Sequence, residues 1–306
     1  MRGSLIDDRK RVRQMKIGLV GLGRMGQAIF ARLRQHGFEL VAWDLDPAVG
    51  QELRSRGADA ANSPAEVAAR TEIVVSMISA DDGARRNFHG AGGYLEAAIE
   101  GKLLIEMSTL QPMTVRALAA AAAARGAAFI EVPVLGSIPT VHDGKLLALA
   151  GGRAEDIERA RPVLTPLTRR IVHMGPIGSG AAMKLAVNLG LAAYIEALSE
   201  SLALGQQQGL ARDLMLEILG EAPINNPWFR SKLEVFRGGE ADITLDLRTM
   251  RKDVLSALAT GTLDGVPMPV SAGTLASLSA AVAGGWGEKD IAELPAYVRE
   301  HMVRRP

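Results

Sequence analysis

Lys184 and Asn188 are the two polar residues of the apolar segment 181–193, which lies just past the middle of the chain. The surrounding stretch 178–196 holds no proline and is rich in alanine and leucine, so it predicts a long helix with Ser179 as its N-cap. Because the segment is apolar almost all round, we expect both flanks of this helix to be buried.

The spacing of four residues puts Lys184 and Asn188 on one face of the helix, one turn apart. No acidic residue lies within helical reach of the lysine. A buried ammonium group without a partner is costly, so two interpretations are open. The lysine either extends from a half-buried helix to solvent, or it is an acid–base group whose proton affinity is tuned by apolar surroundings.

A glycine motif upstream favours the second interpretation. Segment 16–20 predicts a short apolar strand, and a helix is predicted from the end of the motif to about residue 35. The motif between them reads Gly21, Leu22, Gly23, Arg24, Met25 and Gly26. Gly21 permits a tight turn, Gly23 lets the backbone approach a pyrophosphate, and Gly26 lets helix and strand pack closely. A GxGxxG motif between a strand and a helix predicts a dinucleotide site.

Asp44 closes the next predicted strand, 39–43, at the distance expected for the acid that binds the adenosine ribose. A carboxylate there accepts hydrogen bonds from the ribose hydroxyls and repels a 2′-phosphate. The following residues Leu45 and Asp46 offer no guanidinium group for that phosphate. The sequence therefore favours NAD over NADP as cofactor; the alternative is that Asp44 only caps a helix over 47–56.

Strands and helices alternate as far as about Met174, which predicts an α/β domain with a doubly wound parallel sheet of Rossmann type. The loops at 77–79 and 108–109 follow strands and should lie at the carboxyl edge of the sheet. Beyond Met174 only helices are predicted. We expect a disordered leader over 1–14, a dinucleotide-binding domain over 15–176 and an all-helical domain over 177–306. The long helix should join the two domains, with Lys184 facing the nicotinamide in the cleft between them.

Composition excludes several classes of function. A net charge of +1, from 35 basic and 34 acidic residues, predicts neither a nucleic-acid nor a membrane partner. The chain has no cysteine, and its five histidines include no pair at metal-ligand spacing, so we expect no metal. We find no apolar run long enough to span a bilayer and no signal segment, and therefore expect a cytoplasmic enzyme. Met15, directly before the first strand, is a candidate translation start.

Four motifs in order resemble the 3-hydroxyacid dehydrogenase family over roughly residues 15–300. This family includes 3-hydroxyisobutyrate dehydrogenases, tartronate semialdehyde reductases and glyoxylate/succinic semialdehyde reductases. The motifs are the glycine turn 21–26, the segment 131–137 with Asp143 and Gly144 after it, the segment 178–188, and Lys252 with Asp253.

The resemblance implies a role for individual residues. Lys184 matches the catalytic lysine, which handles the hydroxyl proton during hydride transfer, and Asn188 matches an asparagine that holds substrate. Gly136 and Ser137 match a loop that binds the substrate carboxylate. The resemblance also implies cofactor contacts from Ile78, Ser79, Thr109 and Lys252; without it, Lys252 is an ordinary exposed helix charge.

Leu135 departs from the family pattern, because many members carry a hydroxyl residue in its place. The segment 138–142 and Val187 also differ from many members. We therefore expect an NAD-dependent oxidoreductase for a small 3-hydroxy acid of the 3-hydroxyisobutyrate type, or for the matching semialdehyde. A reductase of a less acidic aldehyde or ketone, an imine reductase-like enzyme and a non-catalytic dinucleotide-binding module stay open as alternatives. The helical domain suggests a homodimer or homotetramer.

Overall fold

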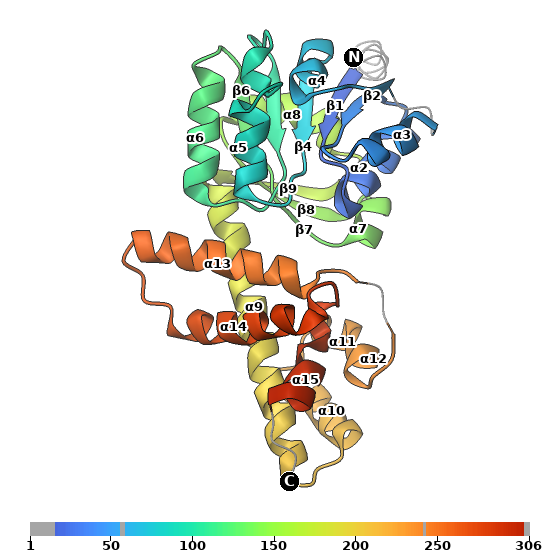
Figure 1. Cartoon of the computed structure of the whole chain (residues 1–306), viewed down its shortest axis with the longest axis vertical. Helices are drawn as coiled ribbons and strands as arrows, with labels where there is room; N and C mark the ends of the chain where they lie inside the picture. Colours follow the sequence, from blue (N-terminus) through green and yellow to red (C-terminus); the bar gives the residue numbers. More distant parts are fainter. Residues whose placement is uncertain (1–15, 56–58, 241–242, 303–306) are drawn as a thin grey trace, which may run out of the picture. The chain divides into compact units, whose positions relative to one another are not determined.

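Nine strands form one sheet in the N-terminal part of the computed structural model, which describes residues 16–55, 59–240 and 243–302 (Figure 1). The strands are β1 (Lys16–Val20), β2 (Glu39–Trp43), β3 (Asp59–Ala60), β4 (Ile73–Ser76), β5 (Leu103–Glu106), β6 (Ala128–Glu131), β7 (Val134–Leu135), β8 (Leu146–Gly151) and β9 (Thr168–Gly175). Their order is β3-β2-β1-β4-β5-β6-β8-β7, with β9 on β8. The predicted leader 1–14 and Met15 lie outside the described residues.

The first six strands are parallel, and the order reverses beside β1, as in a doubly wound sheet. The predicted parallel sheet is wrong for the later strands, because β8 pairs antiparallel with β6 and with β7. The connection 136–145 from β7 to β8 is too short for the crossover that a parallel pair requires. The pairing of β9 with β8 is parallel again.

Helices cover both faces of this sheet (Figure 1). They are α2 (Arg24–Gln35), α3 (Pro47–Ser55), α4 (Pro64–Arg70), α5 (Asp81–His89), the 3-10 turn η1 (Tyr94–Glu96), α6 (Pro112–Ala123), α7 (Ile138–His142) and α8 (Ala154–Leu164). Each face of the sheet has its own apolar core, and because side chains alternate along a strand, β1, β2, β4, β5 and β6 send residues into both cores.

The C-terminal part of the chain forms a second unit, the helical unit, whose described residues form helices and the loops that connect them. Its helices are α9 (Ser179–Gln207), α10 (Arg212–Glu221), α11 (Pro227–Ser231), α12 (Leu233–Phe236), α13 (Leu247–Leu263), α14 (Pro269–Ala281), η2 (Val282–Trp286), η3 (Ile291–Glu293), α15 (Leu294–Tyr297) and η4 (Val298–Met302). Contacts between residues divide the chain after Lys184, inside α9, whereas the sequence places the boundary at 176/177. The chain turns at Lys232 between α11 and α12, and the ammonium group of Lys232 is buried against Asp290 at 2.7 Å.

Only one face of α9 is buried, so the expectation that both flanks would be buried is wrong. Ala181, Leu185 and Asn188 begin a stripe of buried positions, whereas Met183 between them is 40% exposed. By length and composition α9 could also cross a membrane, which the search for apolar runs missed. Length and composition are weak evidence, however, and the residues of this stripe from Ala192 to Leu202 pack in the core of the helical unit.

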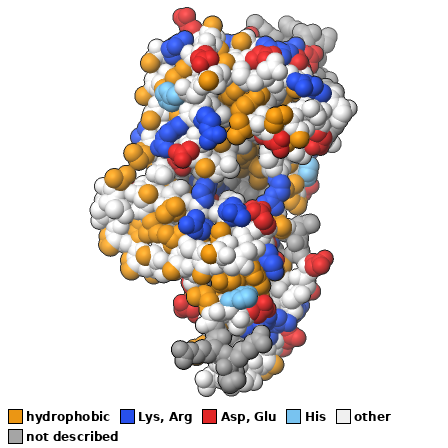
Figure 2. All heavy atoms as spheres, in the orientation of Figure 1, with side chains coloured by type: hydrophobic (Ala, Val, Ile, Leu, Met, Phe, Trp, Pro, Cys, Tyr) orange, Lys and Arg blue, Asp and Glu red, His pale blue; other side chains and the backbone are white. Residues whose placement is uncertain are grey.

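Large apolar side chains remain exposed on the second half of α13, in the loop that follows it and at the start of α14. Leu255 and Leu263 are 46% and 68% exposed, and Val266 and Val270 are 54% and 64% exposed. Figure 2 shows hydrophobic side chains gathered over this part of the helical unit. We call these four residues the α13/α14 patch.

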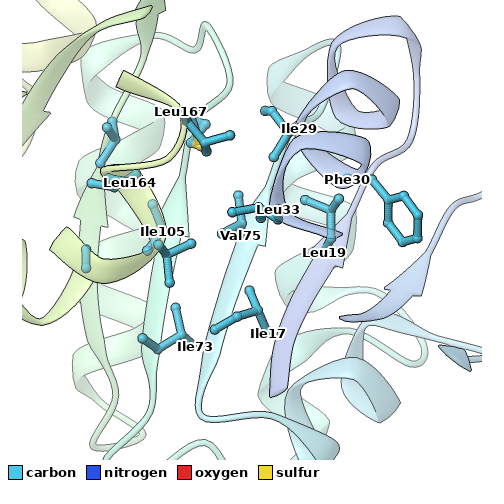
Figure 3. Packing of buried hydrophobic residues seen from close by; sticks show 14 of the residues in the cluster. Ile17, Leu19, Ile29, Phe30, Leu33, Ile73, Val75, Ile105, Leu164 and Leu167 are labelled. Carbon is cyan, nitrogen blue, oxygen red and sulfur yellow. The ribbon is translucent and has the colours of Figure 1, made fainter. Parts of the chain in front are cut away.

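The core on one face of the sheet fixes the strand that carries the glycine turn. Ile17 and Leu19 of β1 pack with Ile29 and Leu33 of α2, and all four are fully buried (Figure 3). Truncation of such a side chain to alanine typically destabilises a protein by about 2–5 kcal/mol. The turn between β1 and α2 is therefore held from both sides by close packing.

Candidate functional site

The glycine turn has the shape that a dinucleotide requires. Gly21 has φ +88°, and a Cβ atom there would lie 2.3 Å from the carbonyl oxygen of Met77. A Cβ atom on Gly26 would lie 2.0 Å from the carbonyl oxygen of Gly21, so helix and turn approach as closely as the motif predicts. In contrast, Gly23 has open space on its Cβ side, and among the described residues no side chain caps α2 there. The amides at the start of α2 therefore fit a pyrophosphate.

The two motif residues that follow Gly23 are Arg24 and Met25, which form the start of α2. Arg24 is exposed and Met25 is half-buried.

Asp44 braces the glycine turn. Its Oδ2 accepts a hydrogen bond from the amide of Leu22 at 2.6 Å, and its Oδ1 accepts one from the amide of Asp46 at 2.9 Å. The alternative role, capping of the next helix, belongs instead to Asp46, whose Oδ1 accepts a bond from Ala48 at 2.9 Å. Asp44 thus sits at the carboxyl end of β2, where the ribose-binding acid of a dinucleotide fold lies.

The loops after β4 and β5 lie together, as their predicted positions at the sheet edge require. The amide of Ile78 donates to Ser108 Oγ at 2.6 Å, and the amide of Gln111 donates to Asp81 at 3.0 Å. Ser79 is exposed and Thr109 is half-buried. The first of these loops also packs against the glycine turn, because a Cβ atom on Gly21 would lie 2.7 Å from Ile78 Cδ1.

Glu131, quoted in a motif but given no role by the sequence, holds the first turn of α9. Its Oε1 accepts bonds from the amides of Gly178 at 2.5 Å and Gly180 at 3.0 Å, and its Oε2 accepts one from Ala181 at 3.1 Å. Burial raises the pKa of this carboxyl, although the three amide hydrogen bonds and the charge of Arg116 act in the opposite direction.

The N-cap role predicted for Ser179 is therefore wrong. Ser179 is the first residue of α9, and a side chain from β6, far away in the sequence, accepts the bonds that an N-cap normally accepts. Lys184 lies three residues after Ala181, so Glu131 anchors the helical turn directly before the lysine. Lys184 itself is half-buried.

Asn188 and Lys252 both meet Asp253 in the helical unit. Asn188 Nδ2 donates to Asp253 Oδ2 at 2.6 Å, and Lys252 Nζ lies 2.8 Å from Asp253 Oδ1. Asn188 is 4% exposed and Asp253 is 2% exposed. Because the amide nitrogen is committed to the carboxylate, the amide oxygen is the atom that Asn188 can offer as an acceptor to another molecule. Lys252 is 24% exposed, so it is not an ordinary surface charge.

Gly136 and Ser137 form the turn between β7 and α7. Gly136 has φ +144°, and a Cβ atom there would lie 2.6 Å from Leu146 Cδ2. The amide of Ser137 donates to Thr140 Oγ1 at 3.1 Å, and the two hydroxyl groups lie 3.2 Å apart, so Ser137 caps α7. Leu135, directly before this turn, is half-buried.

The structure thus brings together the glycine turn, Asp44 and the two loops within the N-terminal unit. Within the helical unit it brings together Asn188 and Lys252, and α9 carries Lys184 one turn before Asn188. Among the residues that the structure describes, no three His, Asp or Glu side chains are grouped to hold a metal ion.

A doubly wound sheet with this turn at its switch point defines a dinucleotide-binding domain. The model of the NAD binding domain of 6-phosphogluconate dehydrogenase matches residues 16–175. The model described as NAD-binding of NADP-dependent 3-hydroxyisobutyrate dehydrogenase matches residues 178–298. The chain belongs to the 3-hydroxyacid dehydrogenase family and is a nicotinamide-dinucleotide-dependent oxidoreductase, as the four motifs predict.

Several relatives resemble the chain over most of its length. Glyoxylate/succinic semialdehyde reductase 1 of Arabidopsis thaliana is 34% identical over 276 residues, which cover 90% of this chain and 96% of the relative. A 3-hydroxyisobutyrate dehydrogenase of Pseudomonas aeruginosa is 34% identical over 251 residues, 79% of this chain and 84% of the relative. The solved 3-hydroxyisobutyrate dehydrogenase of Mycobacterium tuberculosis with L-serine has a TM-score of 0.82 at 24% identity, covering 94% of this chain and 99% of that one, which confirms the fold.

Proposed function

We propose that this enzyme transfers hydride between NAD and a small 3-hydroxy acid of the 3-hydroxyisobutyrate type, or the matching semialdehyde. The observation that carries the proposal is the pair Lys184 and Asn188 on α9, with the first turn of that helix fixed by Glu131 and the amide of Asn188 oriented by Asp253. Two relatives named for 3-hydroxyisobutyrate and for glyoxylate and succinic semialdehyde support this substrate class.

The residues would act as follows. A bound nicotinamide supplies the hydride acceptor or donor. Lys184 takes the hydroxyl proton during oxidation and returns it to the developing alkoxide during reduction. The amide oxygen of Asn188 accepts a bond from the substrate hydroxyl and fixes its direction. The turn at Gly136 and Ser137 binds the carboxylate of the substrate.

The preference for NAD over NADP rests on Asp44. Its carboxylate is held at the end of β2 by two backbone amides, so it cannot turn away from an incoming 2′-phosphate without losing both bonds. A negative charge at that position repels the phosphate, and the next residues along the chain, Leu45 and Asp46, add no positive charge.

A reductase of a less acidic aldehyde or ketone is the second candidate. Leu135 favours it, because this half-buried isobutyl group directly precedes the turn that should bind the substrate carboxylate. An imine reductase-like enzyme and a non-catalytic module fit less well, because this chain retains both Lys184 and Asn188.

A substrate screen tests the proposal. Purified protein is offered 3-hydroxyisobutyrate, glycerate, serine, 4-hydroxybutyrate, glyoxylate and succinic semialdehyde, each with NAD(H) and NADP(H), and the absorbance of the reduced nicotinamide is followed. We expect turnover of at least one 3-hydroxy acid or semialdehyde with NAD(H), and a loss of about 100-fold in kcat for Lys184→Ala with little change in NADH affinity. Activity of that variant within a few-fold of the wild type would refute the catalytic role of the lysine.

We also infer that the enzyme is a cytoplasmic homodimer or homotetramer that binds neither nucleic acid nor membranes. The α13/α14 patch supports the oligomer, since exposed apolar side chains that cluster on a surface commonly mark a protein interface. Light scattering after size-exclusion chromatography tests it: we expect a dimer or tetramer for the wild type, and dissociation when Leu263 and Val266 are changed to serine. A monomeric wild type would exclude this inference.

A further inference from the structure

Two loops at the carboxyl edge of the sheet are tied to each other in both directions. Ile78, in the loop after β4, donates its amide proton to Ser108 in the loop after β5, at 2.6 Å. Gln111 at the end of the second loop donates its amide proton to Asp81, at the start of α5, at 3.0 Å. Each segment therefore supplies an acceptor to the other, and neither can move alone without breaking a bond.

The acceptor on Ser108 depends on a buried acid, Glu106, the last residue of β5. The amide of Ser108 donates to Glu106 Oε1 at 3.0 Å, and the hydroxyl of Ser108 donates to the same oxygen. Both residues are 2% exposed. The Ser108 hydroxyl has one proton. When that proton is donated to the carboxylate of Glu106, the lone pairs of Ser108 Oγ are left to accept the amide proton of Ile78.

We propose that Glu106 is a positioning residue that acts through Ser108 to hold the backbone at Ile78 and Ser79 in the arrangement that receives the nicotinamide half of the dinucleotide. The proposal rests on the proposed function, and it takes the cofactor contacts that the family resemblance implies for Ile78, Ser79 and Thr109 to lie at this half. It assigns a role to a buried group that takes no part in hydride or proton transfer.

The surroundings of Glu106 bring the pKa of its carboxyl close to neutral pH. Burial raises the pKa of Glu106, the bonds from Ser108 lower it and the charge of Asp81 raises it, with a net value of about 7. Tyr94 of η1 faces the same site and is bonded to Ser76 at 2.8 Å.

On the neighbouring strand β6, Glu131 is paired with Glu106 in the register of the sheet. The carboxylate of Glu131, however, is directed to the amides of α9. Arg116 lies close enough to Glu131 to lower the pKa of that carboxyl. A carboxylate at Glu106 orients the Ser108 hydroxyl more strongly than a neutral carboxyl does. We therefore expect the affinity for the nicotinamide half to rise as the pH rises through about 7.

The test compares two ligands that share the same adenosine and pyrophosphate. NADH carries the nicotinamide, and ADP-ribose lacks it. Their dissociation constants are measured by calorimetry at pH 6 and pH 8 for the wild type, Glu106→Gln and Ser108→Ala. Glu196→Gln is the matched control, because Glu196 is a half-buried acid with a buried Oε2 that also accepts a bond from a serine, Ser277, at 2.5 Å, but lies in the helical unit.

We expect both test variants to bind NADH about tenfold more weakly at pH 8, as the loss of one buried hydrogen bond implies, with ADP-ribose affinity within twofold of the wild type. The wild type should bind NADH more weakly at pH 6 than at pH 8, and Glu106→Gln should lose that dependence. Unchanged NADH affinity in a folded Ser108→Ala protein, or equal weakening of both ligands, would overturn the proposal.

If neither variant folds, the two ligands are compared in the wild type across the same pH range. A ratio of the NADH and ADP-ribose dissociation constants that does not change with pH would refute the proposal. Failure of the proposed function looks different. If its NAD preference fails, neither NADH nor ADP-ribose binds tightly to the wild type at either pH; if only its substrate class fails, both ligands still bind and the substrate screen shows no turnover.

Discussion

Replacement of Glu131 tests whether one buried carboxylate positions α9, the helix that carries the proposed catalytic residue Lys184. Glu131→Ala leaves the amides of Gly178, Gly180 and Ala181 without their acceptor. Glu131→Gln has the same shape but only one acceptor oxygen. That oxygen can serve Gly178 and Gly180, while the amide nitrogen of the new side chain faces the amide of Ala181, donor against donor.

The magnitude follows from the three bonds and from burial. A buried amide that loses its partner destabilises a protein by about 1–3 kcal/mol, but burial of the carboxylate opposes the native state, as the raised pKa of Glu131 indicates. We therefore expect Glu131→Ala to lower the free energy of unfolding by about 3–5 kcal/mol and Glu131→Gln by about 1–2 kcal/mol.

The pH dependence has a definite sign. Because the folded protein holds the proton of Glu131 more tightly than the unfolded chain does, the wild type loses stability as the pH rises from the unfolded pKa through the raised folded pKa. Glu131→Gln lacks this loss, so the stability difference between the two proteins narrows above that range.

Urea unfolding at several pH values gives these energies, and kcat of the folded variants reports on Lys184, one turn further along α9. We expect kcat to fall more than tenfold for Glu131→Ala and to be partly retained in Glu131→Gln. Glu196→Gln controls for the loss of a half-buried acid further along α9. A Glu131→Ala protein within 1 kcal/mol of wild-type stability and with wild-type kcat would refute the reasoning.

Three further predictions concern the glycine turn, the proposed substrate-binding residue Asn188 and the buried acid Glu106. Gly26→Ala places a Cβ atom 2.0 Å from a backbone carbonyl oxygen of the turn, so NADH affinity measured by calorimetry should fall more than about 100-fold, whereas Gly50→Ala, with open space around it, should bind as the wild type does. Asp253→Asn removes the charge that orients Asn188, and we expect KM to rise about tenfold with a smaller change in kcat in steady-state assays. The pKa of about 7 at Glu106 predicts that wild-type stability falls by about 3 kcal/mol between pH 4.5 and pH 8, and urea unfolding of Glu106→Gln should lack that fall.

The sequence predicts the parts of the fold that depend on local pattern. The strand β1, the glycine turn and α2 follow one another within 20 residues, and their roles are set by backbone freedom and apolar alternation. The position of Asp44 at the end of β2 is likewise readable from the chain. The helical character of the second unit follows from its composition.

Features that depend on distant partners could not be read in the same way. Ser179 looks like an N-cap because its type and position fit, yet Glu131 of β6 accepts the bonds from the start of α9. The antiparallel pairing of β8 is set by how the chain returns after α7. The exposed face of α9 shows that an apolar composition alone does not say which flank is covered.

The sequence predicts no role for Glu106 or Glu131, because their burial and the amides that they contact are visible only in the folded chain. They occupy paired positions at the carboxyl ends of β5 and β6, and each directs its carboxylate to amides of the segment that follows a strand. Burial raises the pKa of both, so each ionised acid destabilises the fold to some degree. Apolar residues at these positions would avoid burying an ionised carboxylate, but the loop after β5 and the first turn of α9 would lose the acceptors of their amides. The two adjacent acids at the carboxyl ends of β5 and β6 thus combine a burial cost with hydrogen bonds that fix the segments they contact, as expected if they position the proposed site.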